Sequence, residues 1–244
     1  MYNDNAKKIH DRLFPGFPMN ENDPDYDYAR RYENWAYDEV INANDLDERH
    51  RMLATLATCM GALAVDEFGV LIPGAINSFG LTPEEVKEVV YQGTAYLGMA
   101  RVHPFLMKTN EVFRAMGIEE SKESRLTNTD ETRQPTGTQA QIDIFGENMK
   151  DFWKGGTVNY WLASNCFGDY YTRKGLDLRD REMITYCFLL AQGGCEPQLK
   201  SHIQGNINVG NDVDFLTKVT EQMVPYIGYP RSLNAFACLA QFRK

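Results

Sequence analysis

An internal repeat at a constant spacing limits the folds that this chain can adopt. Residues of a segment that begins at Leu46 recur from Leu176 onward, and 176 − 46 gives a shift of 130 residues. In the first set, Leu46, Asp47, Arg49, Arg51 and Thr55 match Leu176, Asp177, Arg179, Arg181 and Thr185. In the second set, Gly80, Val89, Gln92, Tyr96, Gly98 and Arg101 match Gly210, Val219, Gln222, Tyr226, Gly228 and Arg231. The matches cluster at expected helix starts and turn glycines. We therefore predict two copies of a helical unit of roughly one hundred residues, related by a pseudo-twofold axis.

Helix signals dominate the chain, and no stretch alternates convincingly between apolar and polar residues. The clearest helix start is LTPEEVKEVV, in which Thr82 caps, Pro83 occupies the first turn and Glu85 completes a capping box. Further helices are expected over residues 26–42 with Asp25 as the cap, 47–63, 99–116, 138–153, 158–171, from 176 onward and from 196 or 197 onward. The predicted fold class is all-α, with central helical hairpins.

Three segments are expected to be less regular. Residues 1–25 hold a short helix at most and then an irregular, proline-rich arm. The segment 68–79 contains two glycines and Pro73, which predicts a weak or broken helix. Residues 119–137 are charged and turn-rich, as is typical of a linker. The predicted organisation is therefore the arm and first copy over 1–118, the linker over 119–137, and the second copy over 138–244.

Composition narrows the kinds of partner. The formal net charge is −9, and the basic residues form no block, which argues against a polyanion-binding surface. The longest apolar run, Met183–Ala191, is about half of a membrane span, and the N-terminal residues do not resemble a signal peptide, so we expect a cytoplasmic protein. The 5 cysteines show no CxxC or metal-knuckle spacing, and no two of the 4 histidines lie three or four residues apart. We expect reduced thiols, no metal and no cofactor, since no dinucleotide fingerprint is present either.

The stretch LDLRDREMITYCFLLAQGGCEPQLKSH, residues 176–202, carries the candidate chemistry. It holds Glu182, Cys195 and His202. At the matching positions the first copy has Met52, Ala64–Val65 and Leu71–Ile72, none of which is polar. The first copy thus keeps the helix signals and loses the three polar groups. This difference separates the residues that form the fold from the residues that could carry a reaction, and it predicts a site in the second copy only.

Each candidate residue has a structural alternative. Cys195 precedes a helix start, where free N–H groups and the helix dipole lower the pKa of a thiol, but it could also be a small turn residue. His202 lies two turns further, on about the same face, and could equally be a satisfied core residue beside Leu199 and Ile203. Glu182 suits proton transfer to a histidine, but an acid in the first turn of a helix also offsets the helix dipole.

The other aromatic and imidazole side chains are assigned to structure. Tyr96 and Tyr226 recur in both copies, which favours packing. The group Trp161, Phe167, Tyr170 and Tyr171 is expected in the core or in subunit contacts, and His50 and His103 are expected to be structural or exposed.

The second copy resembles the carboxymuconolactone decarboxylase-like family, which includes the alkylhydroperoxidase D-like proteins. The resemblance rests on FGDYYTRKGLDLRDREMIT, HIQGNINVG and YIGYPRSLNAF, and more faintly on LDERHRMLATLA, AINSFGLTPEEVKEVV and AYLGMAR in the first copy. It implies an all-α fold with a central helical hairpin that assembles into trimers or hexamers. For two copies per chain, it implies a homo-oligomer of three chains, a pseudo-hexamer.

The resemblance also suggests roles for the candidate residues. In the decarboxylase-like branch, the residues that match Glu182 and His202 are acid/base or substrate-binding groups. In the alkylhydroperoxidase branch, Cys195 matches the first cysteine of a CxxC motif, but the second position is Gln198. This departure argues against a disulfide-cycling mechanism that needs both thiols on one helix.

Three functions follow from these observations. The first is a lyase that performs acid/base chemistry on a small carboxylated or lactone metabolite through Glu182 and His202, with Cys195 lining the pocket. The second is a thiol-dependent, peroxiredoxin-type antioxidant oxidoreductase in which Cys195 attacks a peroxide. The third is a non-enzymatic assembly module.

Overall fold

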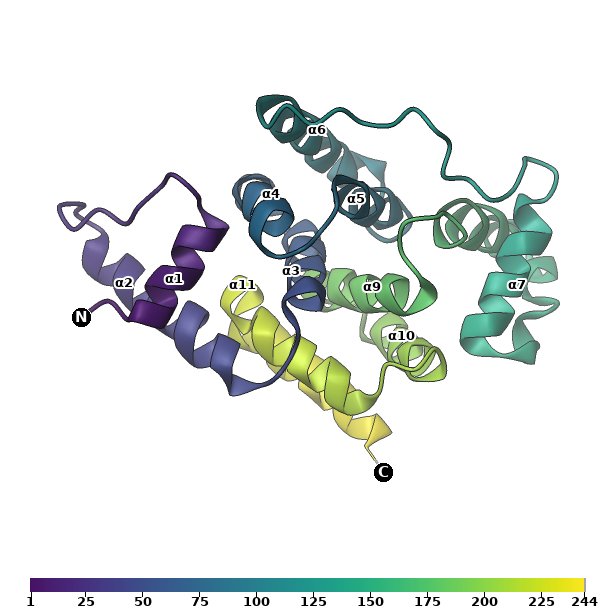
Figure 1. The fold of residues 1–244 in the computed structure, drawn as a ribbon. Coiled ribbons are helices and arrows are strands. Elements are labelled where there is room, and N and C mark those ends of the chain that lie inside the picture. The colour runs from purple at the N-terminus through teal and green to yellow at the C-terminus, as the bar shows by residue number, and fades with distance from the viewer. Residues whose placement is uncertain (244) are drawn as a thin grey trace.

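The computed structural model describes residues 1–243, and this part of the chain is helical and contains no strand. The predicted all-α class is confirmed. Figure 1 shows α1 and α2 at one end of the molecule, α7 at the other, and α3 and α9 between them. The α-helices are α1 (Asp4–Leu13), α2 (Tyr26–Asn34), α3 (Glu48–Gly61), α4 (Val65–Ser78), α5 (Pro83–Leu97), α6 (Met99–Ala115), α7 (Arg133–Phe145), α8 (Thr157–Trp161), α9 (Leu178–Gln192), α10 (Glu196–Asn208) and α11 (Val213–Leu239). The shorter elements are the π-helices η1 (Trp35–Val40) and η5 (Leu162–Tyr171), and the 3₁₀ turns η2 (Ile41–Ala43), η3 (Glu147–Met149), η4 (Phe152–Gly155) and η6 (Ala240–Phe242).

The centre of the core is the contact between α3 and α9. From Met52 to the end of α3, every residue is buried, and the same holds for α9 from Asp180 to Ala191. A side chain at Gly61 would place its Cβ 2.6 Å from the backbone oxygen of Phe188, so glycine allows the two backbones to approach closely here. The prediction that the helix after residue 47 is central rather than superficial is confirmed.

Local signals recur at the predicted shift of 130 residues. Asp47 caps α3 by accepting from the His50 N–H, and Asp177 caps α9 by accepting from the Asp180 N–H. The chain adopts a left-handed φ of 79° at Gly98 and 72° at Gly228. The π-helices η1 and η5 also overlap at this shift, and η1 lies within residues 26–42, where a helix was expected. A duplicated unit would produce these recurrences, and the division into two copies stays a prediction.

A weak or broken helix was predicted at residues 68–79, and the broken alternative was wrong, because α4 runs without a break from Val65 to Ser78. Pro73 lies inside it, but close packing outweighs its cost: Gly74 faces α1, where an added Cβ would meet the Leu13 backbone oxygen at 2.5 Å. The capping box of α5 is present, with both the Thr82 and the Glu85 side chains bonded as predicted. Asp25, in contrast, makes no capping bond, because its φ of −92° and ψ of 6° are not the extended values of a cap residue.

The segment between α6 and α7 crosses the molecule as an extended loop (Figure 1). The helix α7 begins at Arg133, inside the residues expected to form the linker. Gly137 is buried in it, and a Cβ there would lie 1.8 Å from the Ala163 backbone oxygen. That glycine therefore serves helix packing rather than chain flexibility. Within residues 1–243, no helix combines the length and apolar character that a membrane crossing requires.

Candidate functional site

Two of the three candidate residues, Glu182 and His202, form a buried pair. Glu182 lies in the first half of α9 and His202 on α10, with 0% and 7% of their surfaces exposed. The His202 Nδ1 lies 2.9 Å from the Glu182 Oε2. The turn that returns α10 onto α9 uses Gly193 and Gly194, whose φ values of 69° and 70° favour glycine.

Close contact between α9 and α10 sets the position of this pair. At Gly205, an added Cβ would lie 2.5 Å from the Glu182 Oε2, so the backbone of α10 directly limits the space of the carboxylate. The Asn206 side chain donates to the backbone oxygens of Glu182 (2.9 Å) and His202 (2.7 Å). The Asn206 amide therefore links α10 to α9 next to the Glu182–His202 pair.

The second oxygen of Glu182 accepts a hydrogen bond from Tyr171, a residue of η5. The Tyr171 hydroxyl donates to Oε1 at 2.7 Å and also lies 2.8 Å from the Tyr96 hydroxyl and 2.9 Å from Thr185 Oγ1. A phenol has one hydrogen, so Tyr171 accepts from these two hydroxyls while it donates to Glu182. Burial raises the pKa of Tyr96 and Tyr171 well above that of a free tyrosine, and both therefore stay protonated.

The hydrogen-bond chain continues to Cys166. Its Sγ donates to the Tyr96 hydroxyl at 3.7 Å, and burial raises the pKa of this thiol to about 12. Cys166 is therefore a neutral donor at the end of the chain. The direction of donation runs from Cys166 through Tyr96 and Tyr171 to the carboxylate.

Tyr171 was assigned to packing from the sequence, and this assignment missed its contact with Glu182. An aromatic residue at helical spacing is typical of a core, and only the phenol oxygen distinguishes Tyr171 from a packed Phe. Tyr96, also assigned to packing, comes from α5 and so from the first half of the chain. The site thus draws on α5, η5, α9 and α10.

The imidazole of His202 has one occupied and one free nitrogen. A carboxylate only accepts, so Nδ1 carries the hydrogen that bonds to Glu182 and, in the neutral ring, Nε2 carries the lone pair. Among residues 1–243, no group forms a hydrogen bond with Nε2. The ring is held edge-to-face by Tyr96 and Phe145, with centroid distances of 5.3 Å and 5.5 Å. This arrangement presents an oriented base at the end of a buried polar chain.

Cys195 has different surroundings. Its side chain makes no cap bond to α10, and its Sγ instead donates to the Leu189 backbone oxygen at 3.4 Å. Burial raises the pKa of this thiol, so the expectation of a thiolate-rich Cys195 was wrong. The small cavity beside it is lined by residues that include Leu199 and Arg231 but neither Glu182 nor His202. The structure therefore does not join Cys195 to the Glu182–His202 pair.

His50 and His103 differ in their environments. His50 bonds to Asp47 and Asp180, whereas His103 is exposed. In the described part of the chain, no three His, Cys, Asp or Glu side chains are grouped so that they could hold a metal ion.

Comparisons with known proteins identify relatives of this fold and of this region. The model of the carboxymuconolactone decarboxylase family matches residues 158–241, which include all three candidate residues. A 4-carboxymuconolactone decarboxylase from Acinetobacter baylyi is 27% identical over 103 residues, 42% of this chain and 76% of that protein. A crystal structure described as a gamma-carboxymuconolactone decarboxylase subunit from Burkholderia xenovorans aligns with a TM-score of 0.54 at 18% identity, over 97% of this chain and 95% of that one. At this identity the structural likeness shows the fold alone, and the resemblance predicted from the sequence is confirmed.

Proposed function

We propose that this chain, a carboxymuconolactone decarboxylase-like protein, decarboxylates a small carboxylated lactone and uses His202 for the proton transfer. One observation carries the proposal: Nδ1 of His202 is bonded to a fully buried carboxylate at 2.9 Å, while Nε2 is free of protein partners among residues 1–243. A histidine oriented in this way is a general acid or base. The relative from Acinetobacter baylyi supports the substrate class.

The chemistry requires a proton donor rather than a nucleophile. When the bond between carbon and the departing CO₂ breaks, the electron pair stays on the substrate carbon and delocalises toward the lactone carbonyl. A proton must then replace the lost carboxyl group. The imidazolium of His202 supplies that proton from Nε2, and the neutral imidazole remains on the enzyme until it takes up a proton from water.

Glu182 acts through His202. Both of its oxygens are engaged, one by Tyr171 at 2.7 Å and one by the imidazole at 2.9 Å, so neither is free to meet a substrate. Its role is to fix the orientation of the ring and to stabilise the imidazolium. We therefore treat Glu182 and Tyr171 as positioning residues, and His202 as the catalytic residue.

Replacing His202 tests the proposal with 4-carboxymuconolactone as the probe. We expect His202→Gln to lower kcat/KM by about 10²- to 10⁴-fold, the usual contribution of a positioned acid or base. Glu182→Gln keeps an acceptor for Nδ1 and should cause a smaller loss. The assay follows loss of the substrate and release of CO₂.

The matched control is His103→Gln, the same change at an exposed histidine. It should leave the rate within about twofold of wild type. Circular dichroism checks that each variant is folded. A folded His202→Gln protein that turns over at the wild-type rate overturns the proposal.

The two other functions have less support. A peroxide-reducing thiol needs thiolate character, and the raised pKa of Cys195 opposes it. An assembly module does not require a Glu–His pair buried at the cost of desolvation.

A further inference from the structure

A cavity lies between α2, the end of α3, the start of α4 and α11, in the half of the chain that lacks the Glu–His pair. Its free volume is about 260 Å³. The side chains that matter for its chemistry are Tyr28, Tyr32, Cys59, Ala64, Glu67 and Tyr226. Three of them are phenols and one is a carboxylate, and among the described residues no Lys, Arg or His lines the cavity. We call it the acidic cavity.

The carboxylate of the acidic cavity has no counter-ion. Glu67 is partly buried, and within residues 1–243 its carboxylate forms neither an ion pair nor a hydrogen bond. Burial raises its pKa above 4.5, and no neighbouring cation opposes this rise. Glu67 lies in the first turn of α4, where the helix dipole favours an acid, but Asp66 in the same turn is exposed. The dipole therefore does not explain why Glu67 lines a cavity.

The phenols and the thiol around Glu67 do not offset its charge. The Tyr32 hydroxyl donates to the Pro225 backbone oxygen at 3.4 Å rather than to the carboxylate. Burial, and then the charge of Glu67, raise the pKa of Tyr32 and of the Cys59 thiol, so both groups stay neutral. A carboxylate beside neutral aromatic rings attracts a cation through its charge and through the ring quadrupoles.

The acidic cavity is specific to the first half of the chain. At the shift of 130 residues, Glu67 corresponds to Pro197 and Tyr32 to Leu162, whereas Tyr226 corresponds to Tyr96. The second half thus keeps one ring but has no carboxylate at the matching position. The acid is therefore not a general requirement of the helical unit.

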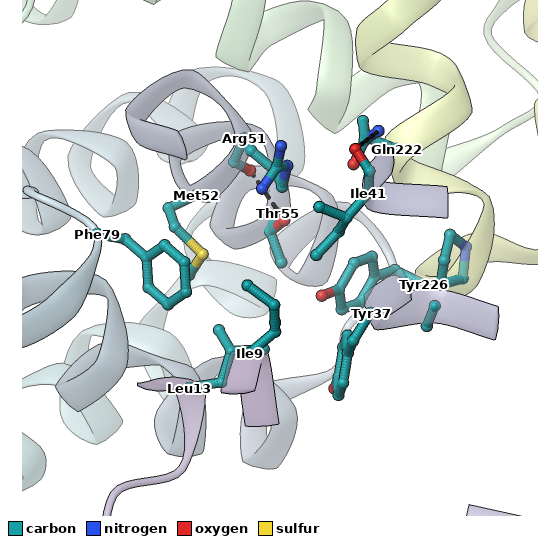
Figure 2. Close-up of a pocket in the computed structure, with 12 residues that line it drawn as sticks. Ile9, Leu13, Tyr37, Ile41, Arg51, Met52, Thr55, Phe79, Gln222 and Tyr226 are labelled. Carbon is teal, nitrogen blue, oxygen red and sulfur yellow. Dashed lines mark hydrogen bonds between the residues drawn. The ribbon is translucent and has the colours of Figure 1, made fainter. Parts of the chain in front are cut away.

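The acidic cavity has room for a small organic cation. A cavity that holds one water needs a free volume of roughly 10–15 Å³. Tyr226 also lines a narrow cavity beside Arg51 and Gln222, which Figure 2 shows, and its free volume of about 20 Å³ suits about one water. The acidic cavity is much larger, and Tyr28, which is 77% exposed, lies at its opening to solvent.

We propose that the acidic cavity binds a small methylated ammonium ion. The positive charge lies next to Glu67 and replaces the missing counter-ion, while the methyl groups contact the rings of Tyr32 and Tyr226. A primary ammonium group needs an acceptor for each of its three hydrogens, and Glu67 is the one charged acceptor in the described lining. Methyl groups need no acceptor and suit aromatic walls. The proposal is independent of the function proposed for His202.

Titration with tetramethylammonium tests the site, observed by NMR through the ¹³C-labelled methyl group of Ala64, which lines the cavity. We expect a saturable shift of this methyl in wild-type protein. tert-Butanol has a similar shape without the charge, and it should bind at least about 10-fold more weakly at the same ionic strength.

Two substitutions separate the contributions of the charge and of the ring. Glu67→Gln keeps the size of the side chain and should weaken binding of tetramethylammonium by about 10-fold or more. Tyr32→Leu introduces the residue of the second half and should weaken it by about 3- to 30-fold. Tyr32→Phe keeps the ring and should bind within about threefold of wild type.

The matched control is Asp66→Asn, which removes an exposed acid from the same helical turn. It should bind tetramethylammonium as wild type does, and so should His202→Gln, because the sites are separate. Circular dichroism checks that each variant is folded. Absence of a saturable Ala64 shift in folded wild type, equal affinities for tetramethylammonium and tert-butanol, or an unchanged affinity in Glu67→Gln overturns the proposal.

Discussion

The same substitution is expected to change the free energy of unfolding by different amounts at Arg51 and at Arg181, because the surroundings of the two side chains differ. Arg181 is fully buried and holds Glu88, which is itself 0% exposed. Arg181→Gln leaves that carboxylate with Arg173 as its remaining cation, and we expect a loss of about 3 kcal/mol in the free energy of unfolding. Arg51→Gln leaves no buried carboxylate behind and should cost about 1 kcal/mol or less. Urea denaturation of both variants measures the difference, and equal losses would contradict the assignment of Glu88 as the partner that matters.

At the same scale, the sequence located some site residues and missed others for physical reasons. Glu182 and His202 were selected from the sequence as a candidate acid/base pair, and the structure places them in contact. Their catalytic role stays a prediction. The pKa of Cys195 was predicted in the wrong direction, because the sequence does not show whether a thiol faces the free amides of α10 or the core. Tyr171 was missed because the partner of its hydroxyl depends on the tertiary packing of η5.

Among the helices, the cap residues and turn glycines could be predicted from the sequence, but whether a helix continues without a break could not. The capping box of α5 depends on neighbours in sequence, and it formed as expected. The continuity of α4 depends on α1, which packs against Gly74 and is distant in sequence. Local propensity therefore failed where a long-range contact supplied the stabilisation.

The contact of α7 with η5 gives a test at this scale. An added Cβ at Gly137 would lie 1.8 Å from the Ala163 oxygen and 2.4 Å from the Gly168 nitrogen. Because backbone cannot move aside as a flexible side chain can, Gly137→Ala should lower the free energy of unfolding by about 1–3 kcal/mol or more, despite the better helix propensity of alanine. Gln139→Ala, at an exposed position of the same helix, is the control. Thermal and urea unfolding measure both variants, and an unchanged stability of Gly137→Ala would show that the helices can separate without cost.

At the scale of the whole molecule, charged side chains join the two central helices and predict how stability depends on pH. Asp180 on α9 binds Arg49 at 2.6 Å and His50 at 3.3 Å, both on α3, and Arg49 also binds Glu85. Hydrogen bonds with Asp180 and then Asp47 raise the pKa of His50 above 6.5. Burial alone would raise the pKa of Asp180, but His50 and Arg49 hold it below 3.8.

The directions of these two pKa shifts define the pH range in which each group stabilises the folded state. The contribution of His50 is complete below about pH 6.5 and is lost as the pH rises through its raised pKa. The contribution of Asp180 is complete above about pH 3.8 and is lost as the pH falls through its lowered pKa. Unfolding measured from pH 3 to 9 should therefore show that His50→Gln removes part of the decline on the alkaline side, while His103→Gln leaves the profile unchanged. Identical profiles for wild type and His50→Gln would exclude His50 from this linkage.

The overall class of the fold followed from the helix start signals and from the lack of alternating strand patterns, and the central helices α3 and α9 are buried on most sides. The packing of one half on the other could not be derived from those patterns. The predicted boundaries of the two copies and the predicted assembly of three chains stay predictions.

The hydrogen bond between Tyr96 and Tyr171 has a consequence for the independence of the two halves. Tyr96 belongs to α5, and Gln92 of the same helix donates to Thr185 and to the Arg181 backbone oxygen. A fragment that begins at Arg133 would keep Glu182 and His202 but would lose these supports. Two separate subunits would have to associate by diffusion to form this contact, whereas in this chain the two halves are covalently joined. The half without a buried Glu–His pair therefore covers the half that has one, and removal of either half would expose buried surface of the other.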